Sequence, residues 1–236
     1  MLKILTVVGA RPQFVKAAVL SRLIRSEEYR GRISEFLVHT GQHYDENMSV
    51  VFFREMEIPE ADANLGIGGG SHGRMTGDML TGIEGILLER RPDLVVVYGD
   101  TNSTLAGALA AAKLHVPVAH VEAGLRSYDK RMPEEQNRIL VDHLSAWLFC
   151  PTDTALKNLG KEGIANAKTS DAMPNSDAPL VSIVGDVMLD ASLYYRRLAS
   201  IRPANERALS RLRISTPFRL LTLHRAENTD DADRLG

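Results

Sequence analysis

Short apolar runs alternate with longer amphipathic segments along most of this chain. The runs are Lys3–Val8, Ile33–His39, Leu94–Tyr98, Val116–Val121 and Trp147–Cys150. Most of them are continuously apolar rather than alternating, which is typical of parallel strands that are buried on both faces. Between them, helical periodicity covers Pro12–Arg25, Arg74–Glu89, Thr104–Lys113 and Glu134–Ser145. This alternation predicts βαβ units and an α/β fold with a doubly wound parallel sheet.

The pattern changes near residue 165. The segment Ala165–Ala178 is rich in Asn, Ser, Asp, Pro and Lys, which favours a solvated loop or linker. Beyond it we expect an apolar run at Leu180–Val184, helices near Asp186–Arg197 and Asn205–Arg213, and a second run at Phe218–Leu223. Two strands do not form a sheet that buries both faces. We therefore expect an N-terminal Rossmann-like domain at 1–165, a linker or loop at 166–179 and a partial second domain at 180–236.

Composition and charge exclude several classes of protein. Hydrophobic residues make up 44% and charged residues 25% of the chain, which is ordinary for a globular protein and excludes disordered and fibrous classes. The 28 Lys and Arg residues nearly balance 30 Asp and Glu residues, which argues against a nucleic-acid partner. No apolar run reaches the length of a membrane span, and Met1–Val8 is too short for a signal peptide. With a single cysteine, Cys150, the chain is expected to be cytoplasmic, in a reducing compartment and away from membranes.

Candidate chemistry collects directly after the apolar runs. Ligands of open parallel sheets bind beyond the carboxyl ends of the strands. Four such ends carry glycine beside an ionisable or hydrogen-bonding side chain; they are Gly9–Lys16, Thr40–Asp45, Gly99–Ser103 and Glu122–Ser127. The sequence therefore predicts a binding site at one edge of the sheet.

The first strand end suits a diphosphate. Gly9 permits a tight turn, and the helix that follows directs N–H groups and the positive end of its dipole toward the crevice. Arg11 adds a bidentate cation and Lys16 a point charge. An ordinary βα turn with surface charges stays open, because the three-glycine dinucleotide fingerprint is absent. The glycine-rich stretch Gly68–Gly73 is equally compatible with a second anion cradle and with a hinge.

Four carboxylates lie on or near the same predicted rim: Asp100, Glu122, Glu134 and Glu135. Carboxylates in different environments are the usual equipment for moving protons. Asp100 is equally compatible with a helix N-cap, and Glu134 and Glu135 with first-turn acids that complement a helix dipole. Glu122 follows a buried strand and precedes a glycine, which makes a purely structural role less natural.

Other chemistries lack support. The histidines show no zinc-ligand spacing, so a metal site is not expected. No cofactor is expected either. A Gly-x-Ser-x-Gly elbow is absent, and Cys150 falls in a predicted buried strand, so nucleophilic catalysis by Ser or Cys is unsupported.

Taken together, these motifs resemble the non-hydrolysing UDP-N-acetylglucosamine 2-epimerase family. The resemblance runs in order from Met1 to Asn228. It rests on Gly9–Pro12 with Lys16, His39–His43, Gly99–Thr101, His120–Arg126, Pro133–Arg138, and His224, Arg225, Glu227 and Asn228. The segments His120–Arg126 and Pro133–Arg138 are the most specific.

The resemblance implies a two-domain fold like that of GT-B glycosyltransferases, with the second nucleotide-binding domain incomplete here. It implies reversible inversion at C2 of UDP-N-acetylglucosamine, giving UDP-N-acetylmannosamine, through elimination and re-addition of UDP. The implied roles are proton transfer, stabilisation of the leaving UDP and substrate contact. Proton transfer falls on Asp100, Glu122 and Glu134. Stabilisation of the leaving UDP falls on Arg11, Lys16 and His224, and His224 is also expected to be catalytic. Substrate contact falls on Gln42, His43 and Arg138.

The chain departs from the family pattern at three places. Relatives continue well beyond this length and take most UDP contacts from the second domain, so we expect this chain alone to bind UDP poorly. Met75 stands where bacterial enzymes typically carry Gln, and Ser127–Met132 is closer to relatives that act on other UDP-2-acetamido sugars. A hydrolysing epimerase and a non-catalytic binding module therefore stay open as alternatives. Expected partners are a UDP-sugar, a second copy in a homodimer or other self-association, and a separate chain that supplies the remaining half-domain.

Overall fold

A computed structural model describes residues 1–41, 57–166, 173–201, 210–214, 217–219 and 221. The chain divides into two compact units, Met1–Leu193 and Tyr194–Gly236. The first unit contains the whole sheet and all the candidate site residues that the structure describes.

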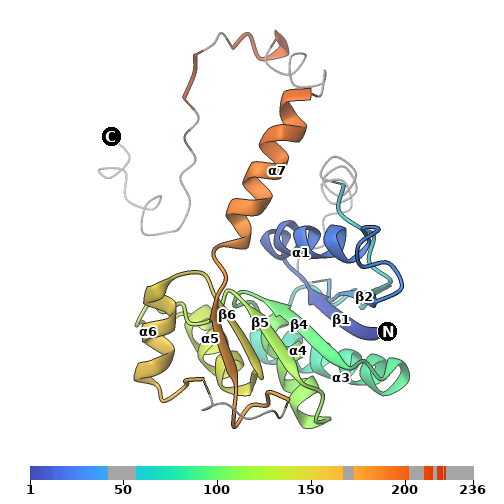
Figure 1. Ribbon diagram of the computed structural model, residues 1–236, viewed down its shortest axis with the longest axis vertical. Helices are drawn as coiled ribbons and strands as arrows, with labels where there is room; N and C mark the ends of the chain where they lie inside the picture. Colours follow the sequence, from blue (N-terminus) through green and yellow to red (C-terminus); the bar gives the residue numbers. More distant parts are fainter. Residues whose placement is uncertain (42–56, 167–172, 202–209, 215–216, 220, 222–236) are drawn as a thin grey trace. The chain divides into compact units, whose positions relative to one another are not determined.

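The first unit is built on a seven-stranded parallel sheet with the order β3-β2-β1-β4-β5-β6-β7 (Figure 1). The strands are β1 (Leu2–Val8), β2 (Ile33–His39), β3 (Ala63–Asn64), β4 (Leu94–Tyr98), β5 (Val118–Val121), β6 (Trp147–Cys150) and β7 (Leu180–Ile183). The chain begins at the centre with β1, moves outward to β3, and returns to place β4 on the other side of β1. This reversal confirms the predicted doubly wound α/β sheet and puts the topological switch point between β1 and β4.

Helices follow most of the strands. They are α1 (Arg11–Ile24), α3 (His72–Arg90), α4 (Asn102–Lys113), α5 (Pro133–Leu144), α6 (Asp153–Lys161) and α7 (Val187–Ile201). The four helices predicted before residue 150 are confirmed to within a few residues. Helix α6 was not predicted. Thr152 is its N-cap, since the Thr152 side chain accepts a hydrogen bond from the Ala155 N–H at 3.2 Å.

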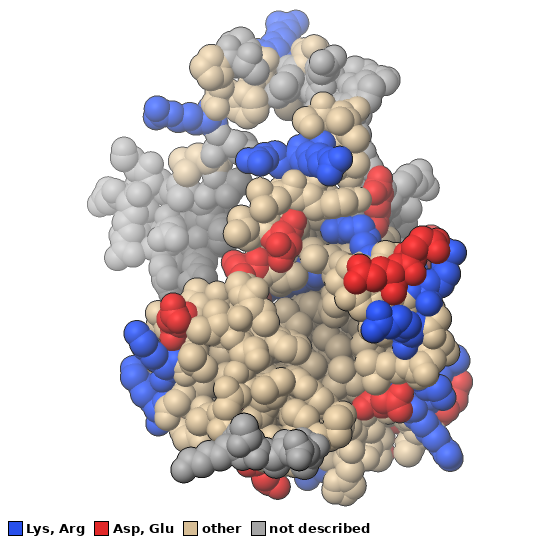
Figure 2. Space-filling model, in the orientation of Figure 1, with Lys and Arg blue, Asp and Glu red and all other residues tan. Residues whose placement is uncertain are grey.

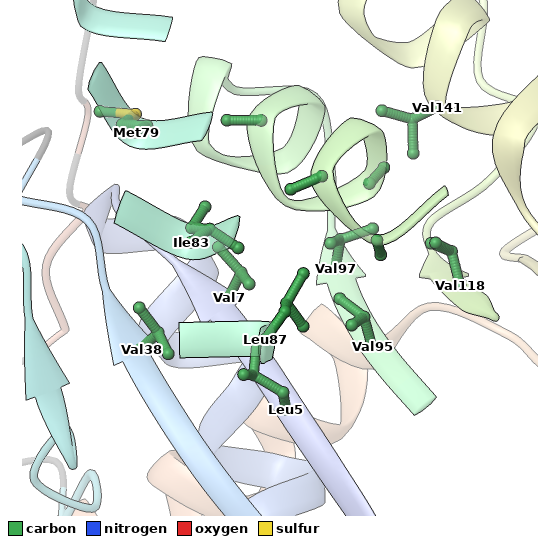
Figure 3. Close-up of a cluster of buried hydrophobic side chains, with 14 of the residues drawn as sticks. Leu5, Val7, Val38, Met79, Ile83, Leu87, Val95, Val97, Val118 and Val141 are labelled. Atoms are coloured by element: carbon green, nitrogen blue, oxygen red, sulfur yellow. The ribbon is translucent and has the colours of Figure 1, made fainter. Parts of the chain in front are cut away.

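The core has two layers because helices cover both faces of the sheet. Leu5 and Val7 of β1 pack with Ile83 of α3 on one face (Figure 3). Ile4 and Val8 pack with residues of α1 on the other face. Successive side chains of a strand point to opposite faces, so a strand that is buried on both sides must be apolar throughout. This explains the continuous apolar runs in the sequence.

The predicted boundary of the second domain is wrong in one respect. Leu180–Ile183 was expected to open a second sheet, but it forms β7 and pairs in parallel with β6. Val181 is buried in the same cluster as Leu148 and Leu159, and β7 covers an edge of β6 that would otherwise present unpaired backbone groups. The first unit therefore extends to Leu193 rather than ending near residue 165.

The loop that precedes β7 is confirmed where the structure describes it. There, Asn175 Oδ1 accepts hydrogen bonds from the N–H groups of Asp177 (2.9 Å) and Ala178 (3.0 Å). Most of the predicted helix Asn205–Arg213 and half of the predicted strand Phe218–Leu223 lie outside the described residues.

Candidate functional site

Three strand ends meet at the switch point of the sheet. Thr40, after β2, and Ser103, at the start of α4, share a hydrogen bond of 2.7 Å between their hydroxyl oxygens. A Cβ atom on Gly9, after β1, would lie 2.0 Å from Ser103 Oγ and 2.3 Å from Thr40 Oγ1. Only glycine fits between these two hydroxyls. The predicted convergence of strand ends at one edge is therefore confirmed.

Gln13, in the first turn of α1, connects the end of β1 to the end of β4 through the hydrogen bonds of its side chain. Its Oε1 accepts hydrogen bonds from the Gly9 N–H (2.8 Å) and the Ala10 N–H (2.9 Å). Its Nε2 donates to the Tyr98 carbonyl (2.7 Å) and to the Thr104 hydroxyl (2.8 Å). The Gly9 and Ala10 N–H groups, which precede α1, are therefore already bound, and contact between the N–H groups of α1 itself and a diphosphate stays a prediction. Arg11 is exposed at the start of the same helix.

Lys16 and Glu122 form an ion pair across the end of β4. Lys16 comes from α1, whereas Glu122 follows β5 directly. A Cβ atom on Gly99 would lie 3.5 Å from Lys16 Nζ and 3.8 Å from Glu122 Oε2, so Gly99 lies beside the pair. The Glu122 backbone has a φ of 77°, a conformation that non-glycine residues rarely adopt and that is concentrated at functional sites. The fold thus joins the predicted phosphate-binding lysine to a predicted proton-transferring acid.

Asp100 forms a second ion pair, with Arg138 of α5. The Asp100 backbone carbonyl also accepts a hydrogen bond from Asn137 Nδ2 at 2.9 Å. The N-cap of α4 is Thr101, whose hydroxyl accepts from the Thr104 N–H at 3.3 Å. The alternative role of Asp100 as a helix cap is therefore excluded, and its carboxylate faces a cation at the rim.

The two acids at the start of α5 have different environments. Glu135 is buried, and its carboxylate accepts from the Ser127 N–H (2.8 Å), the Tyr128 N–H (2.9 Å) and Arg138 Nη1 (3.1 Å). Burial alone would raise the pKa of Glu135, but these hydrogen bonds and the Arg138 charge outweigh it and lower the pKa. Glu134 is exposed. Glu135 therefore holds the loop after β5, and Glu134 is the acid of the two that solvent reaches.

A buried network behind the rim was missed in the sequence. Asp142 of α5 accepts from the Gly124 N–H (3.1 Å) and from Arg126 Nη1 (2.7 Å). Arg126 also donates to both carboxylate oxygens of Glu162, at 2.7 and 2.6 Å. Burial would lower the pKa of Arg126, but Glu162 and Asp142 outweigh it and raise that pKa. The sequence signal that could have indicated this network is Asp142. It lies two helical turns beyond Glu135 and therefore on the same buried side of the predicted helix.

Three predicted residues, Gln42, His43 and His224, lie outside the described part of the chain. Within the described part, no cluster of three or more His, Cys, Asp and Glu side chains is placed to hold a metal ion. In that same part, no helix is both long enough and apolar enough to cross a membrane. On the face shown in Figure 2, positive and negative side chains are interspersed rather than segregated.

Comparison with known proteins gives consistent matches. A family model described as UDP-N-acetylglucosamine 2-epimerase matches residues 26–236. A Pseudomonas aeruginosa protein named UDP-2,3-diacetamido-2,3-dideoxy-D-glucuronate 2-epimerase is 52% identical over 99% of this chain and 60% of its own length. The Escherichia coli UDP-N-acetylglucosamine 2-epimerase is 34% identical over 96% of this chain and 58% of its own length.

Solved structures agree with the sequence matches. The crystal structure of Methanocaldococcus jannaschii UDP-GlcNAc 2-epimerase in complex with UDP-GlcNAc and UDP matches with a TM-score of 0.81 and 45% identity. The match covers 99% of this chain and 59% of that one, so this chain spans about three fifths of the length of these relatives. The match confirms the expected GT-B-like fold over the part that is shared.

Proposed function

The chain belongs to the UDP-N-acetylglucosamine 2-epimerase family, and from this premise we propose that it carries part of the active site of an enzyme that inverts C2 of a UDP-2-acetamido sugar. The reaction proceeds by elimination and re-addition of UDP. The C2–H and C1–O bonds break, a C1–C2 double bond forms, and UDP leaves. The same steps in reverse, with a proton delivered to the opposite face of C2, give the epimer.

This reaction has two physical requirements. The C2 proton is not adjacent to a carbonyl and is weakly acidic, so a carboxylate must be held against it. The departing diphosphate develops negative charge and needs fixed cations. The observation that carries the proposal is the Lys16–Glu122 pair beside Gly99, because it places a cation and a carboxylate at one strand end.

We assign roles on this basis. Asp100, Glu122 and the exposed Glu134 transfer protons, and Arg11 and Lys16 bind the diphosphate. Arg138 contacts the substrate from its position beside Asp100. Contacts to the substrate by Gln42 and His43, and stabilisation of the leaving UDP by His224, stay predictions.

Two sugars are candidates. UDP-N-acetylglucosamine is the substrate named for most of the relatives. One relative that is 52% identical is named for UDP-2,3-diacetamido-2,3-dideoxy-D-glucuronate, and another of the same identity is named a UDP-N-acetylglucosamine 2-epimerase homolog, so both sugars are tested. The loop Ser127–Met132, anchored by Glu135, is the segment that we expect to distinguish between the two sugars. Presenting both UDP-sugars separately, and measuring kcat/KM for each, distinguishes them.

The test is exchange at C2. The protein is incubated in deuterated water with each UDP-sugar, and proton NMR follows loss of the C2–H signal and appearance of the epimer. We expect E122Q, D100N and E134Q each to slow exchange by about 10²–10⁴-fold, the usual contribution of a positioned acid or base. E89Q is the matched control, because Glu89 is exposed in the last turn of α3 and pairs with the neighbouring Arg90.

The outcomes separate the alternatives. Release of UDP together with a free sugar identifies a hydrolysing epimerase. Tight binding of UDP-N-acetylglucosamine in calorimetry, with no exchange, identifies a binding module. Neither exchange nor binding, in this chain and in a version extended to the length of the relatives, contradicts the proposal.

Assembly and location are further proposals. We propose that the chain self-associates, as a homodimer or otherwise, and that a separate chain supplies the remaining half of the second nucleotide-binding domain. Cytoplasmic location stays a prediction. Light scattering tests the first of these proposals, and a monomer at micromolar concentration contradicts it.

A further inference from the structure

The interior of the sheet edge contains a histidine that the proposed reaction does not use. His120 lies in β5, two residues before Glu122, and is fully buried. Its Nδ1 lies 2.7 Å from Asp142 Oδ1, and its Nε2 lies 2.8 Å from the Gly99 carbonyl oxygen. The ring therefore connects α5 to the end of β4, directly behind the rim.

Both atoms that face the ring are hydrogen-bond acceptors. A neutral imidazole has one N–H and one lone pair, so it can donate to only one of them. With the proton on Nδ1 alone, the Nε2 lone pair would face the Gly99 carbonyl at 2.8 Å. With the proton on Nε2 alone, the Nδ1 lone pair would face the Asp142 carboxylate at 2.7 Å. The observed geometry is satisfied when each nitrogen carries a proton.

The remaining proton position is on Asp142, and its contacts argue against it. Asp142 Oδ2 accepts from the Gly124 N–H and from Arg126, two donors that favour the ionised carboxylate. The neighbouring charges also balance in this state: His120 and Arg126 are positive, and Asp142 and Glu162 are negative. A buried group of this kind is tolerated when its charges are paired and hydrogen-bonded.

Two other titratable groups are close to this network. The pKa of the Cys150 thiol is raised to about 11, mainly by burial and further by Asp142, so the thiol adds no charge. His143 is half exposed, and its Nε2 lies 3.7 Å from Glu162 Oε2, the carboxylate that pairs with Arg126.

The Gly99 carbonyl is the point at which this ring acts on the rim. Its peptide group includes the nitrogen of Asp100, so fixing the carbonyl fixes the direction in which the chain enters Asp100. Gly99 has a φ of 63°, and its own N–H donates to the Val121 carbonyl at 3.1 Å. β5 therefore holds the turn by its backbone on one side and by the His120 ring on the other.

We propose that His120 is a positioning residue whose doubly protonated ring, held by Asp142, fixes the Gly99 carbonyl and thereby sets the position of the Asp100 carboxylate. The inference rests on the proposed function for its effect on catalysis. Its structural part, the protonation of the ring and the control of the Asp100 turn, is independent of that function.

The first experiment reads the proton state in the 236-residue chain at pH 7. Histidine ring nitrogens are observed by ¹⁵N NMR, and the His120 resonances are identified as the pair that disappears in H120Q. We expect both nitrogens to resonate as N–H-bearing nitrogens. One N–H-bearing nitrogen and one nitrogen with a lone pair would overturn the proposal.

Two substitutions then separate the two contacts. Asn places its amide near the position of Nδ1 and retains the bond to Asp142, whereas Gln places its amide near Nε2 and retains the bond to the Gly99 carbonyl. We expect H120N to shift the Asp100 backbone amide resonance and H120Q to leave it nearly unchanged. The same shift in both variants, or in neither, overturns the proposal even if the chain has no enzymatic activity.

Kinetics supply the final test. In the active protein, we expect H120N to lower kcat by about 10²-fold, the typical effect of a misplacement of about 1 Å, with KM nearly unchanged. H120Q should keep kcat within about fivefold of the wild type although it loses stability through Asp142. A purely structural role predicts that kcat falls in step with thermal stability in both variants. If the wild type itself shows no C2 exchange, the proposed function fails, and the two NMR measurements still decide this inference.

Discussion

Replacing Gln13 with leucine tests whether one buried amide organises the site. Leucine is similar in size and remains compatible with a helix, so the change removes hydrogen bonds with little change in volume. Gln13 is 2% exposed, and its four hydrogen bonds connect the turn after β1 to the end of β4.

The expected loss follows from the groups that are left behind. In Q13L the Gly9 and Ala10 N–H groups lose their acceptor inside the protein, and each unsatisfied buried donor costs about 1–3 kcal/mol. The Tyr98 carbonyl keeps a bond of 2.8 Å from the Thr104 hydroxyl, so it adds little. We expect Q13L to lower the free energy of unfolding by about 2–6 kcal/mol. For a chain of this size that corresponds to a fall in Tm of roughly 4–24 °C.

Q13E adds a dependence on pH. A protonated glutamic acid reproduces the acceptor and one donor of the amide, but a glutamate ion has no hydrogen to give to the Tyr98 carbonyl. The folded state therefore raises the pKa of this carboxyl above its unfolded value of about 4.3. Relative to the wild type, Q13E should be most stable below about pH 4.3 and should lose stability as the pH rises toward 7.

Urea unfolding followed by circular dichroism measures these differences. Q136L is the matched control, because Gln136 lies in the first turns of α5 but is exposed, with one bond of 2.8 Å to the Lys130 carbonyl. We expect Q136L to change stability by less than about 0.5 kcal/mol. A Q13L protein within about 1 kcal/mol of the wild type would show that Gln13 does not organise the site, because two buried donors would then have lost their partner at almost no cost.

Substitutions elsewhere in the first unit should also change stability or reactivity. G124A should lower the free energy of unfolding by more than about 2 kcal/mol, because φ is 79° at Gly124 and a Cβ would lie 2.4 Å from the Ala155 carbonyl oxygen. G85A, in an open position on α3, should raise the free energy of unfolding by about 0.5–1 kcal/mol in the same urea assay. E135Q should lower the free energy of unfolding by about 2–4 kcal/mol at pH 7. Because the folded state lowers the pKa of Glu135, this difference from the wild type should shrink as the pH falls below about 4.3. E134Q should change the free energy of unfolding by less than about 1 kcal/mol, and equal losses in both variants would contradict the assignment of Glu135 as the buried acid. Cys150, with its pKa raised to about 11 by burial, should react with a thiol reagent at pH 8 only when urea unfolds the chain, and fast labelling of the folded protein would show that the strand is open.

The sheet could be predicted from the sequence because burial on both faces leaves a local signature. Val95, Val96 and Val97 are consecutive and all buried, so the pattern in β4 needs no long-range information. The positions of the strand ends could also be predicted, because each apolar run stops where burial on both faces stops. β7 was assigned to the wrong unit because Leu180 and Ile183 look the same whether they extend the first sheet or open a second one. That choice depends on the free edge of β6, which the local sequence does not show.

The site was predictable as a set of residue types but not as a set of partners. Asp100 and Glu122 each follow an apolar run, so their place at the rim follows from topology. That Lys16 pairs with Glu122 and Arg138 with Asp100 depends on helix packing across the sheet. The role of Gln13 was not predicted. Its side chain accepts hydrogen bonds from the Gly9 and Ala10 N–H groups just before its own helix, and a glutamine near a helix start has no distinctive sequence pattern.

The Lys16–Glu122 pair has a consequence for how the proposed reaction is coupled. An ammonium group has three donors, and one of them suffices for Glu122. In the proposed reaction we expect the others to contact a diphosphate oxygen without release of the carboxylate, and 10% of the Lys16 side chain is exposed at the strand end. One cation then contacts both the group that handles the proton and the group that departs. In an elimination, the negative charge leaves the carboxylate as it gains the proton and appears on the diphosphate as C1–O breaks, so the same ammonium group stays paired with negative charge throughout the step.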